Sequence, residues 1–219
     1  MHDTQSDPTE FWEDLYAGKS RWSGSPNPVL VDVVGALPPG RSLDLGCGEG
    51  ADVLWLAGQG WDATGVDISP TAVSRARANA EEIQGSIPGS ATFDSGDLAP
   101  WLTRARVESL GPLDLVTASF FQSPLDDFDR VGIINLAAEM VRPGGHLFAL
   151  SHFAPPDWAP AEHRGHGQMP TPWGEVLDLS VPAGSWTVQI SEVRAREATG
   201  PEGQIGRMKD TVVLLRRER

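Results

Sequence analysis

Short apolar runs alternate with amphipathic segments along the first two thirds of the chain. The apolar runs predict strands at residues 43–45, 60–66, 91–93, 113–118 and 141–150. Helices are expected at residues 9–17, 29–37 and 51–57, after Ser69-Pro70, and within 127–140. Strands that alternate with helices of this length imply a parallel, doubly wound α/β sheet.

The segment 127–140 shows an apolar stripe at helical spacing. This stripe predicts a buried face made of Ile133, Ile134, Ala137 and Met140. Asp126 and Asp127 stand at the beginning of the segment. Because aspartate is a favoured N-cap residue, we expect this pair to cap the helix rather than to act as a base.

Residues 151–174 follow a different pattern, because prolines interrupt them repeatedly. Proline-rich chain does not pack as regular helix or strand, and a loop of this length in a compact domain is usually functional or disordered. The segment follows the fifth strand, at the end of the sheet where ligands lie. We therefore expect it to form part of a substrate wall or lid, with Trp158 as an aromatic contact. A short helix is expected at 173–179.

Residues 43–50 join an acidic strand to a glycine-rich turn, Leu-Asp-Leu-Gly-Cys-Gly-Glu-Gly. Glycines let the backbone turn tightly and approach a ligand closely. The helix that follows presents free N–H groups to an anion. A nucleotide-like ligand is therefore expected across the end of this strand. Gly46, Gly48 and Ala51 also satisfy the looser dinucleotide pattern, so this stretch alone leaves the identity of the nucleotide open.

Two later carboxylates suit the remaining parts of an adenosine ligand. Asp67 ends the second strand about 20 residues past the glycine turn, where a ribose diol is held. Asp97 follows the third strand, where its carboxylate can accept a hydrogen bond from an adenine amino group. Leu98, the next residue, can pack on the adenine ring.

Taken together, these motifs resemble the class I S-adenosylmethionine-dependent methyltransferases. The matching stretches come in the family's order and cover roughly residues 40–151, namely 43–50, 66–69, 96–98, 113–120 and 141–150. The resemblance implies a mostly parallel, seven-stranded α/β sheet that ends in an antiparallel hairpin, with candidate strands at 186–194 and 210–215. Residues 11–16 and 21–28 are similar to those of the thiopurine and tellurite-resistance type, which acts on small molecules.

The resemblance also implies how the chain would bind S-adenosyl-L-methionine. The backbone of Gly46 and Gly48 would approach the methionine and ribose, and Asp44 would face the amino-acid end. Asp67 would take the ribose hydroxyls, and Asp97 the adenine. The expected cofactor-binding residues are Trp22, Asp44, Gly46, Cys47, Gly48, Asp67, Ile68, Asp97, Leu98, Ser119 and Phe120.

We expect a single methyltransferase domain over residues 1–219. Its parts would be an N-terminal helical cap at 1–39, a cofactor-binding core at 40–151, a substrate-side loop at 152–180 and a C-terminal hairpin at 181–219. Most of the remaining tryptophans lie in or beside the expected elements, so core packing is expected for Trp55, Trp61, Trp101 and Trp186.

Aromatic residues are the expected wall of an acceptor pocket, and the expected set is Trp12, Tyr16, Phe121 and Trp158. A sulfonium donor is already activated, so alignment and exclusion of water are the protein's main tasks. His152 is the candidate general base, because it lies at the end of the fifth strand and imidazole titrates near neutral pH. A structural histidine is the alternative for this position.

Charge and cysteine content exclude several classes of partner. The formal net charge is -13, and the basic residues are scattered, which argues against nucleic acid and against an anionic membrane surface as partners.

Cys47 is the single cysteine, so no internal disulfide can form, and we expect it to pack as a small buried residue. His163 and His166 lack a supporting helix, so no metal site is expected. The polar N-terminus lacks the pattern of a signal peptide, so we expect the protein in the cytoplasm. We expect it to be a monomer or a homodimer.

Three hypotheses for function follow. The first is methyl transfer by in-line displacement in a desolvated pocket, to a small molecule that reacts through sulfur, oxygen, nitrogen or a chalcogen oxyanion. The second is an NAD(P)-dependent oxidoreductase on a similar sheet, although Asp44 and Asp97 have no task there. The third is a protein that binds S-adenosylmethionine without catalysing a reaction.

Overall fold

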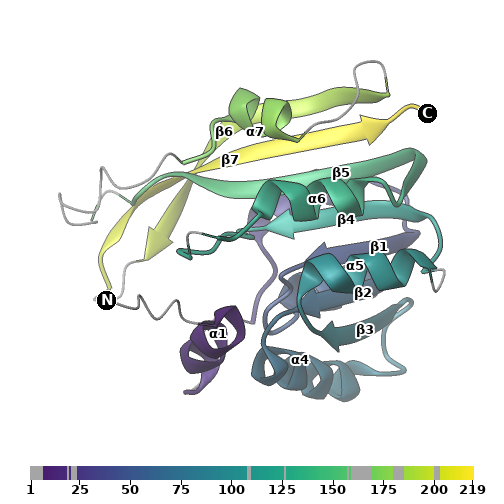
Figure 1. The fold of residues 1–219 in the computed structure, drawn as a ribbon. Helices are drawn as coiled ribbons and strands as arrows, with labels where there is room; N and C mark the ends of the chain where they lie inside the picture. The colour runs from purple at the N-terminus through teal and green to yellow at the C-terminus, as the bar shows by residue number, and fades with distance from the viewer. Residues whose placement is uncertain are drawn as a thin grey trace, which may run out of the picture.

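The computed structural model describes residues 7–18, 20, 24–107, 110–125, 127–156, 158, 169–179, 185–199 and 203–219. These residues form a seven-stranded sheet with the strand order β3-β2-β1-β4-β5-β7-β6 (Figure 1). The strands are β1 (Arg41–Leu45), β2 (Asp62–Asp67), β3 (Ser90–Ser95), β4 (Leu113–Ser119), β5 (Val141–Ala154), β6 (Trp186–Thr199) and β7 (Ile205–Arg217). Strands β1 to β5 pair in parallel, whereas β7 pairs antiparallel with both β5 and β6. The predicted fold class, including the terminal hairpin, is confirmed.

The helices of the described residues cover both faces of the sheet. They are α1 (Pro8–Tyr16), α2 (Pro28–Val34), α3 (Ala51–Gly58), α4 (Pro70–Ile83), α5 (Leu98–Val107), α6 (Arg130–Ala138) and α7 (Pro172–Asp178). One apolar cluster joins the sheet to α5 and α6, and a second joins it to α2, α3 and α4. Successive β5 residues Leu147 and Phe148 belong to different clusters, because neighbouring strand residues point to opposite faces.

The predicted helical stripe and the predicted core tryptophans are confirmed. Ile133, Ile134, Ala137 and Met140 are all buried. Trp61 and Trp101 are buried in the two clusters, while Trp55 and Trp186 pack against their edges.

The predicted cap of α6 is wrong. Asp129 caps this helix, and its Oδ1 accepts a hydrogen bond from the N–H of Gly132 at 2.9 Å. That spacing satisfies a free N–H group of the first helical turn. Asp127 lies before the cap and is exposed, and Asp126 lies outside the described residues. The helix therefore begins later than the sequence pattern predicts.

Strand β5 extends to Ala154, past the residue 150 that the apolar pattern predicts. Ser151, His152 and Ala154 each pair with a residue of β7, which itself runs from Ile205 to Arg217. The antiparallel partner therefore carries the strand into the stretch that was expected to be loop. His152 consequently lies on a strand, at a fixed position in the sheet.

Candidate functional site

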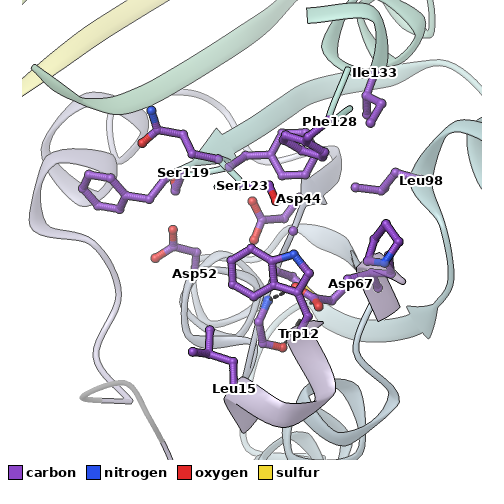
Figure 2. A pocket seen from close by; sticks show the side chains of 18 of the residues that line it. Trp12, Leu15, Asp44, Asp52, Asp67, Leu98, Ser119, Ser123, Phe128 and Ile133 are labelled. Carbon is purple, nitrogen blue, oxygen red and sulfur yellow. Dashed lines mark hydrogen bonds between the residues drawn. The ribbon is translucent and has the colours of Figure 1, made fainter. Parts of the chain in front are cut away.

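A cavity of about 1910 Å³ lies beside the carboxyl ends of β1, β2 and β4 and reaches α1. Figure 2 shows the side chains of Asp44, Asp52 and Asp67 around that of Trp12, which comes from α1. Leu98, Phe128 and Ile133 contribute apolar wall in the same view. The cavity therefore lies at the ends of parallel strands, where α/β sheets bind ligands.

The turn after β1 requires glycine at two positions, Gly46 and Gly50. Gly46 has a φ of 68°, and a Cβ placed there would lie 2.6 Å from Cδ2 of Phe121. Gly50 has a φ of 87°, and its Cβ would lie 2.8 Å from the side chains of Ala76 and Phe93. Any other residue would meet both a strained backbone and a collision with its neighbours. The bare backbone of this turn therefore borders the cavity directly.

Asp44 is a buried carboxylate at the end of β1, with 3% of its surface exposed. Its Oδ1 accepts a hydrogen bond from Oγ1 of Thr117 at 2.6 Å. Burial raises the pKa of Asp44 well above its ordinary value, and the nearby charge of Asp52 adds to this effect. A ligand with a positive charge would favour the ionised form of this group.

Asp52 and Asp67 complete the acidic wall. The Asp52 carboxylate accepts hydrogen bonds from the backbone N–H and the side-chain amide of Asn27, at 2.7 and 2.8 Å. The Asp67 carboxylate accepts from the backbone N–H groups of Gly48 and Ser69, at 2.8 and 2.9 Å. Burial raises the pKa of Asp67, although these N–H groups oppose the shift. Both carboxylates are therefore held in place and retain oxygen lone pairs for a ligand.

Helix α1 closes one side of the cavity through an anchor that the sequence did not reveal. The Glu13 carboxylate accepts hydrogen bonds from Oγ of Ser69 and from the N–H and Oγ1 of Thr71, the latter two at 3.0 and 2.8 Å. These hydrogen bonds, that of Ser69 foremost, lower the pKa of Glu13. The anchor brings Trp12 and Tyr16 to the cavity wall.

A second contact holds the end of α1. The guanidinium of Arg75, on α4, donates to the backbone oxygen of Tyr16 at 3.0 Å and to Glu49 at 2.8 Å. Glu49 belongs to the glycine turn and is buried. The N-terminal segment, α4 and the glycine turn are therefore joined by one arginine.

The residues predicted to surround the adenine border the same cavity. Leu98 is 5% exposed, while Asp97 is exposed and accepts a hydrogen bond from the N–H of Ala99 at 3.2 Å. Ile68 also lines the cavity. An apolar side chain and an exposed carboxylate thus lie next to each other at its rim.

The end of β4 carries two local irregularities. Oγ of Ser119 is buried and makes no hydrogen bond to any residue that the structure describes, yet Ser119 lines the cavity. Phe120 follows with a φ of 51°, a conformation that is strained for a residue with a side chain. An unpaired buried hydroxyl and backbone strain at one site are both typical of a position that meets a ligand.

His152 belongs to a cluster of side chains that could not be predicted from the sequence. Its Nδ1 lies 3.1 Å from Oδ1 of Asp210, which is fully buried on β7. Nε of Arg196, on β6, donates to Oδ2 of the same carboxylate at 2.6 Å. The imidazole also stacks on Phe120, with ring centroids 4.3 Å apart. Asp210 therefore orients both an imidazole and a guanidinium beside the cavity.

The remaining predicted site residues are placed as follows. Phe121 is 7% exposed and packs edge-on against Phe128, so only part of it borders the cavity. Trp158 is half-buried and is not among the residues that line the cavity. Cys47 lines it, and burial raises the pKa of its thiol well above the ordinary value, as fits a packing role. Trp22 lies outside the described residues, as do His163 and His166.

No helix in the described ranges has both the length and the apolar character needed to cross a bilayer.

Comparison with known proteins identifies the family. Residues 43–145 match a family model described as a methyltransferase domain. Thiocyanate methyltransferase 1 from Brassica oleracea is 30% identical over 186 residues, which cover 83% of this chain and 74% of that protein. Probable thiol methyltransferase 2 from Arabidopsis thaliana is 32% identical over 145 residues, which cover 64% of this chain and 60% of that protein.

A solved structure described as "Conversion of a Disulfide Bond into a Thioacetal Group during Echinomycin Biosynthesis" has a TM-score of 0.67 at 26% identity. The match covers 96% of this chain and 93% of that chain. The chain therefore belongs to the S-adenosylmethionine-dependent methyltransferases. S-adenosylmethionine is the cofactor of that family, and the oxidoreductase hypothesis is not favoured.

Proposed function

We propose that this protein transfers a methyl group from S-adenosylmethionine to a small-molecule nucleophile that reacts through sulfur, oxygen, nitrogen or a chalcogen oxyanion. The observation that carries the proposal is the wall of buried carboxylates formed by Asp44, Asp52 and Asp67 around the glycine turn. A cationic donor would be attracted to these charges. The pyrophosphate of a dinucleotide would instead bring its negative charge to the start of α3, next to Asp52.

The cofactor-binding roles follow from position along this wall. Asp67 would accept hydrogen bonds from the ribose hydroxyls, and Asp44 would face the amino-acid end. Asp97 would take the adenine amino group while its neighbour packs on the ring. The unpaired Oγ of Ser119 would bond a polar group of the cofactor. The full proposed set stays Trp22, Asp44, Gly46, Cys47, Gly48, Asp67, Ile68, Asp97, Leu98, Ser119 and Phe120.

The protein would contribute to the reaction in three ways: it would align the acceptor with the methyl group, exclude water, and remove the proton of the acceptor. When bound, S-adenosylmethionine supplies an activated methyl group on a sulfonium. Trp12, Tyr16 and Phe121 would exclude water from the acceptor, and Trp158 is proposed to join them when an acceptor is bound. His152 would remove the proton of a hydroxyl or amine acceptor. Its Nδ1 faces a carboxylate, which favours the tautomer that leaves the lone pair on Nε2.

The names of two relatives support sulfur as the acceptor atom. The Arabidopsis and Brassica relatives carry the names thiol and thiocyanate methyltransferase. Thiols and other soft sulfur nucleophiles are therefore the first acceptors to test. An ionised sulfur acceptor needs no general base, so the proposed base matters only for acceptors that keep their proton.

Transfer of a labelled methyl group tests the proposal. The purified protein is incubated with S-adenosylmethionine carrying tritium in the methyl group and with a panel of thiols, phenols, amines and chalcogen oxyanions. Label in at least one small-molecule product is expected. Binding of the cofactor without transfer to any acceptor class would instead favour the non-catalytic hypothesis.

Other properties are proposed alongside this function. We propose a cytoplasmic monomer or homodimer that does not bind nucleic acid or membranes, supported by the net charge of -13. We also propose that residues 1–39 act as a cap, 40–151 as the cofactor-binding core, 152–180 as the substrate-side segment and 181–219 as the supporting hairpin, within one domain.

A further inference from the structure

Most of the charged side chains that line the cavity are acidic. They include Asp44, Asp52 and Asp67 on the side of β1, β2 and α3, and Asp127, Asp129 and Glu139 around α6. Arg196 of β6 is the only lysine or arginine among the described residues that line the cavity. S-adenosylmethionine carries a net positive charge, which accounts for the acidic wall, and its one carboxylate lies at the amino-acid end that Asp44 is proposed to face. Asp44 stands on β1, and three strands separate β1 from β6. The methyl acceptor therefore remains as the ligand for the guanidinium of Arg196.

Arg196 is held in a fixed position by a fully buried partner. Its Nε donates to Oδ2 of Asp210 at 2.6 Å, while the other oxygen of Asp210 faces His152. Its Cζ lies 5.7 Å from the ring centroid of Phe120, within the range of a cation–π contact. These two contacts fix the direction of the guanidinium plane. A charged group that is already oriented loses little entropy when it binds a ligand.

Most of the hydrogen-bonding capacity of Arg196 is still available. A guanidinium has five N–H groups, and the bond to Asp210 uses only the one on Nε. Nη1 and Nη2 make no hydrogen bond to any described residue, and 29% of the side chain is exposed. Two donor groups therefore remain for an anion at the cavity wall.

The position of Arg196 connects it to the expected site of reaction. Phe120, which the guanidinium overlies, directly follows Ser119 at the end of β4. The backbone N–H of Phe120 donates to the backbone oxygen of Leu150 at 2.7 Å, which holds the main chain of Phe120 against β5. A small ligand that contacts Nη1 or Nη2 would thus lie near the strained residue that borders the proposed cofactor site.

We propose that Arg196 binds a negative charge on the methyl acceptor, so that the preferred acceptor is a small anion rather than a neutral molecule. This inference rests on the proposed methyl transfer, because it assigns the substrate class of that site. Arg196 is a specificity-determining residue in this account. An acceptor whose reacting atom is ionised needs no proton removed, so Arg196 serves it without His152 acting as a base.

Anion binding can be measured without turnover. Thiocyanate, a compact monoanion, is titrated by calorimetry into the protein saturated with S-adenosylhomocysteine, which has no methyl group to transfer. Arg196→Gln is expected to weaken thiocyanate binding at least about tenfold, because a charge-assisted contact is lost. Arg194→Gln is the matched control: Arg194 lies on the same strand, pairs with Asp32 and Glu192, and is not among the cavity-lining residues. Its affinity for thiocyanate should not change.

Loss of Arg196 leaves Asp210 buried with one partner fewer, so the single variant can lose stability. The double variant Arg196→Gln/Asp210→Asn removes both charges and keeps a neutral pair. It should bind S-adenosylhomocysteine like the wild type and still bind thiocyanate more weakly, as Arg196→Gln does. Equal thiocyanate affinity in the wild type and the double variant would overturn the inference.

The acceptor panel separates this inference from the proposed function. For the wild type, the ratio kcat/KM is compared between 3-mercaptopropionate and 1-propanethiol, which differ by a carboxylate. A preference for the charged thiol that disappears in Arg196→Gln supports the inference. Methyl transfer to both thiols with no such preference would refute the inference but leave the methyltransferase proposal intact. Thiocyanate binding through Arg196 without transfer to any acceptor would refute the proposed function alone.

Discussion

His152 and Asp210 lie directly opposite each other in the register of β5 and β7, with Nδ1 of the histidine 3.1 Å from a fully buried carboxylate oxygen. The two residues are 58 positions apart in the chain. The pairing of an edge of the parallel sheet with an antiparallel strand therefore creates an oriented imidazole beside the cavity.

Replacing His152 by alanine should separate acceptors that need a base from those that do not. Turnover of phenol or alcohol acceptors is expected to fall by about 10²–10⁴-fold, whereas thiols that ionise by themselves should retain most of their turnover. His146→Ala provides the control, because His146 lies earlier on β5 and is not among the cavity-lining residues. Equal losses for both acceptor types would remove His152 from the role of base.

Asp67→Ala should weaken binding of S-adenosylmethionine by about 1–3 kcal/mol, because the buried carboxylate that we propose as the acceptor for the ribose hydroxyls is lost. Asp62→Ala, at the opposite end of the same strand, is the control: its side chain is 60% exposed. Isothermal titration calorimetry measures both affinities. Unchanged affinity in Asp67→Ala would contradict the ribose assignment.

Glu13→Gln should loosen α1 and with it the wall that carries Trp12. The substitution keeps the shape of the side chain but removes the negative charge of the carboxylate, whose oxygens accept three hydrogen bonds from Ser69 and Thr71. Cofactor affinity is expected to fall by about 1 kcal/mol, with a faster dissociation rate in stopped flow. Glu10→Gln, on an exposed position of the same helix, should behave like the wild type. A similar loss in both variants would mean that the anchor itself is unimportant.

Cofactor binding should release protons, because the pKa of Asp44 is raised by burial and by the nearby charge of Asp52. In the ligand-free protein, Asp44 keeps its proton over a pH range in which the unfolded chain has lost it. Its contribution to folding stability is therefore fully present below the ordinary aspartate pKa and is lost as the pH rises through the raised value. A bound cation reverses this preference.

Calorimetric titrations in two buffers with different ionisation enthalpies measure the number of protons released. Below the raised pKa, affinity for S-adenosylmethionine should increase with pH, and protons should be released on binding. Asp44→Asn should reduce the release, since the group that loses its proton is gone. Proton uptake in the wild type would contradict the assigned sign.

The sequence was sufficient to predict the strands and the acidic residues at their ends. Asp44 and Asp67 could be located because each stands at the end of an apolar run, and parallel strands bring such ends to one edge of the sheet. The cavity does lie at this edge. Local pattern therefore predicted most of the cavity wall on the cofactor side.

The cluster on the acceptor side could not be predicted in the same way. Asp210 and Arg196 meet His152 only through the register of three strands, and no local pattern specifies that register. Glu13 likewise finds its partners more than fifty residues away. The sequence did contain two signals, Asp210 inside an apolar strand and Arg196 in the neighbouring strand. Neither residue points to a site until the pairing of the strands is known.

We propose above all that the buried carboxylates form a site for a cationic adenosyl donor. Equilibrium dialysis of the purified protein against S-adenosylmethionine and, separately, against NADH tests this site. Stoichiometric retention of S-adenosylmethionine, lost in the double variant Asp44→Asn/Asp67→Asn, is expected, with no retention of NADH. Retention of NADH with no affinity for S-adenosylmethionine would contradict it.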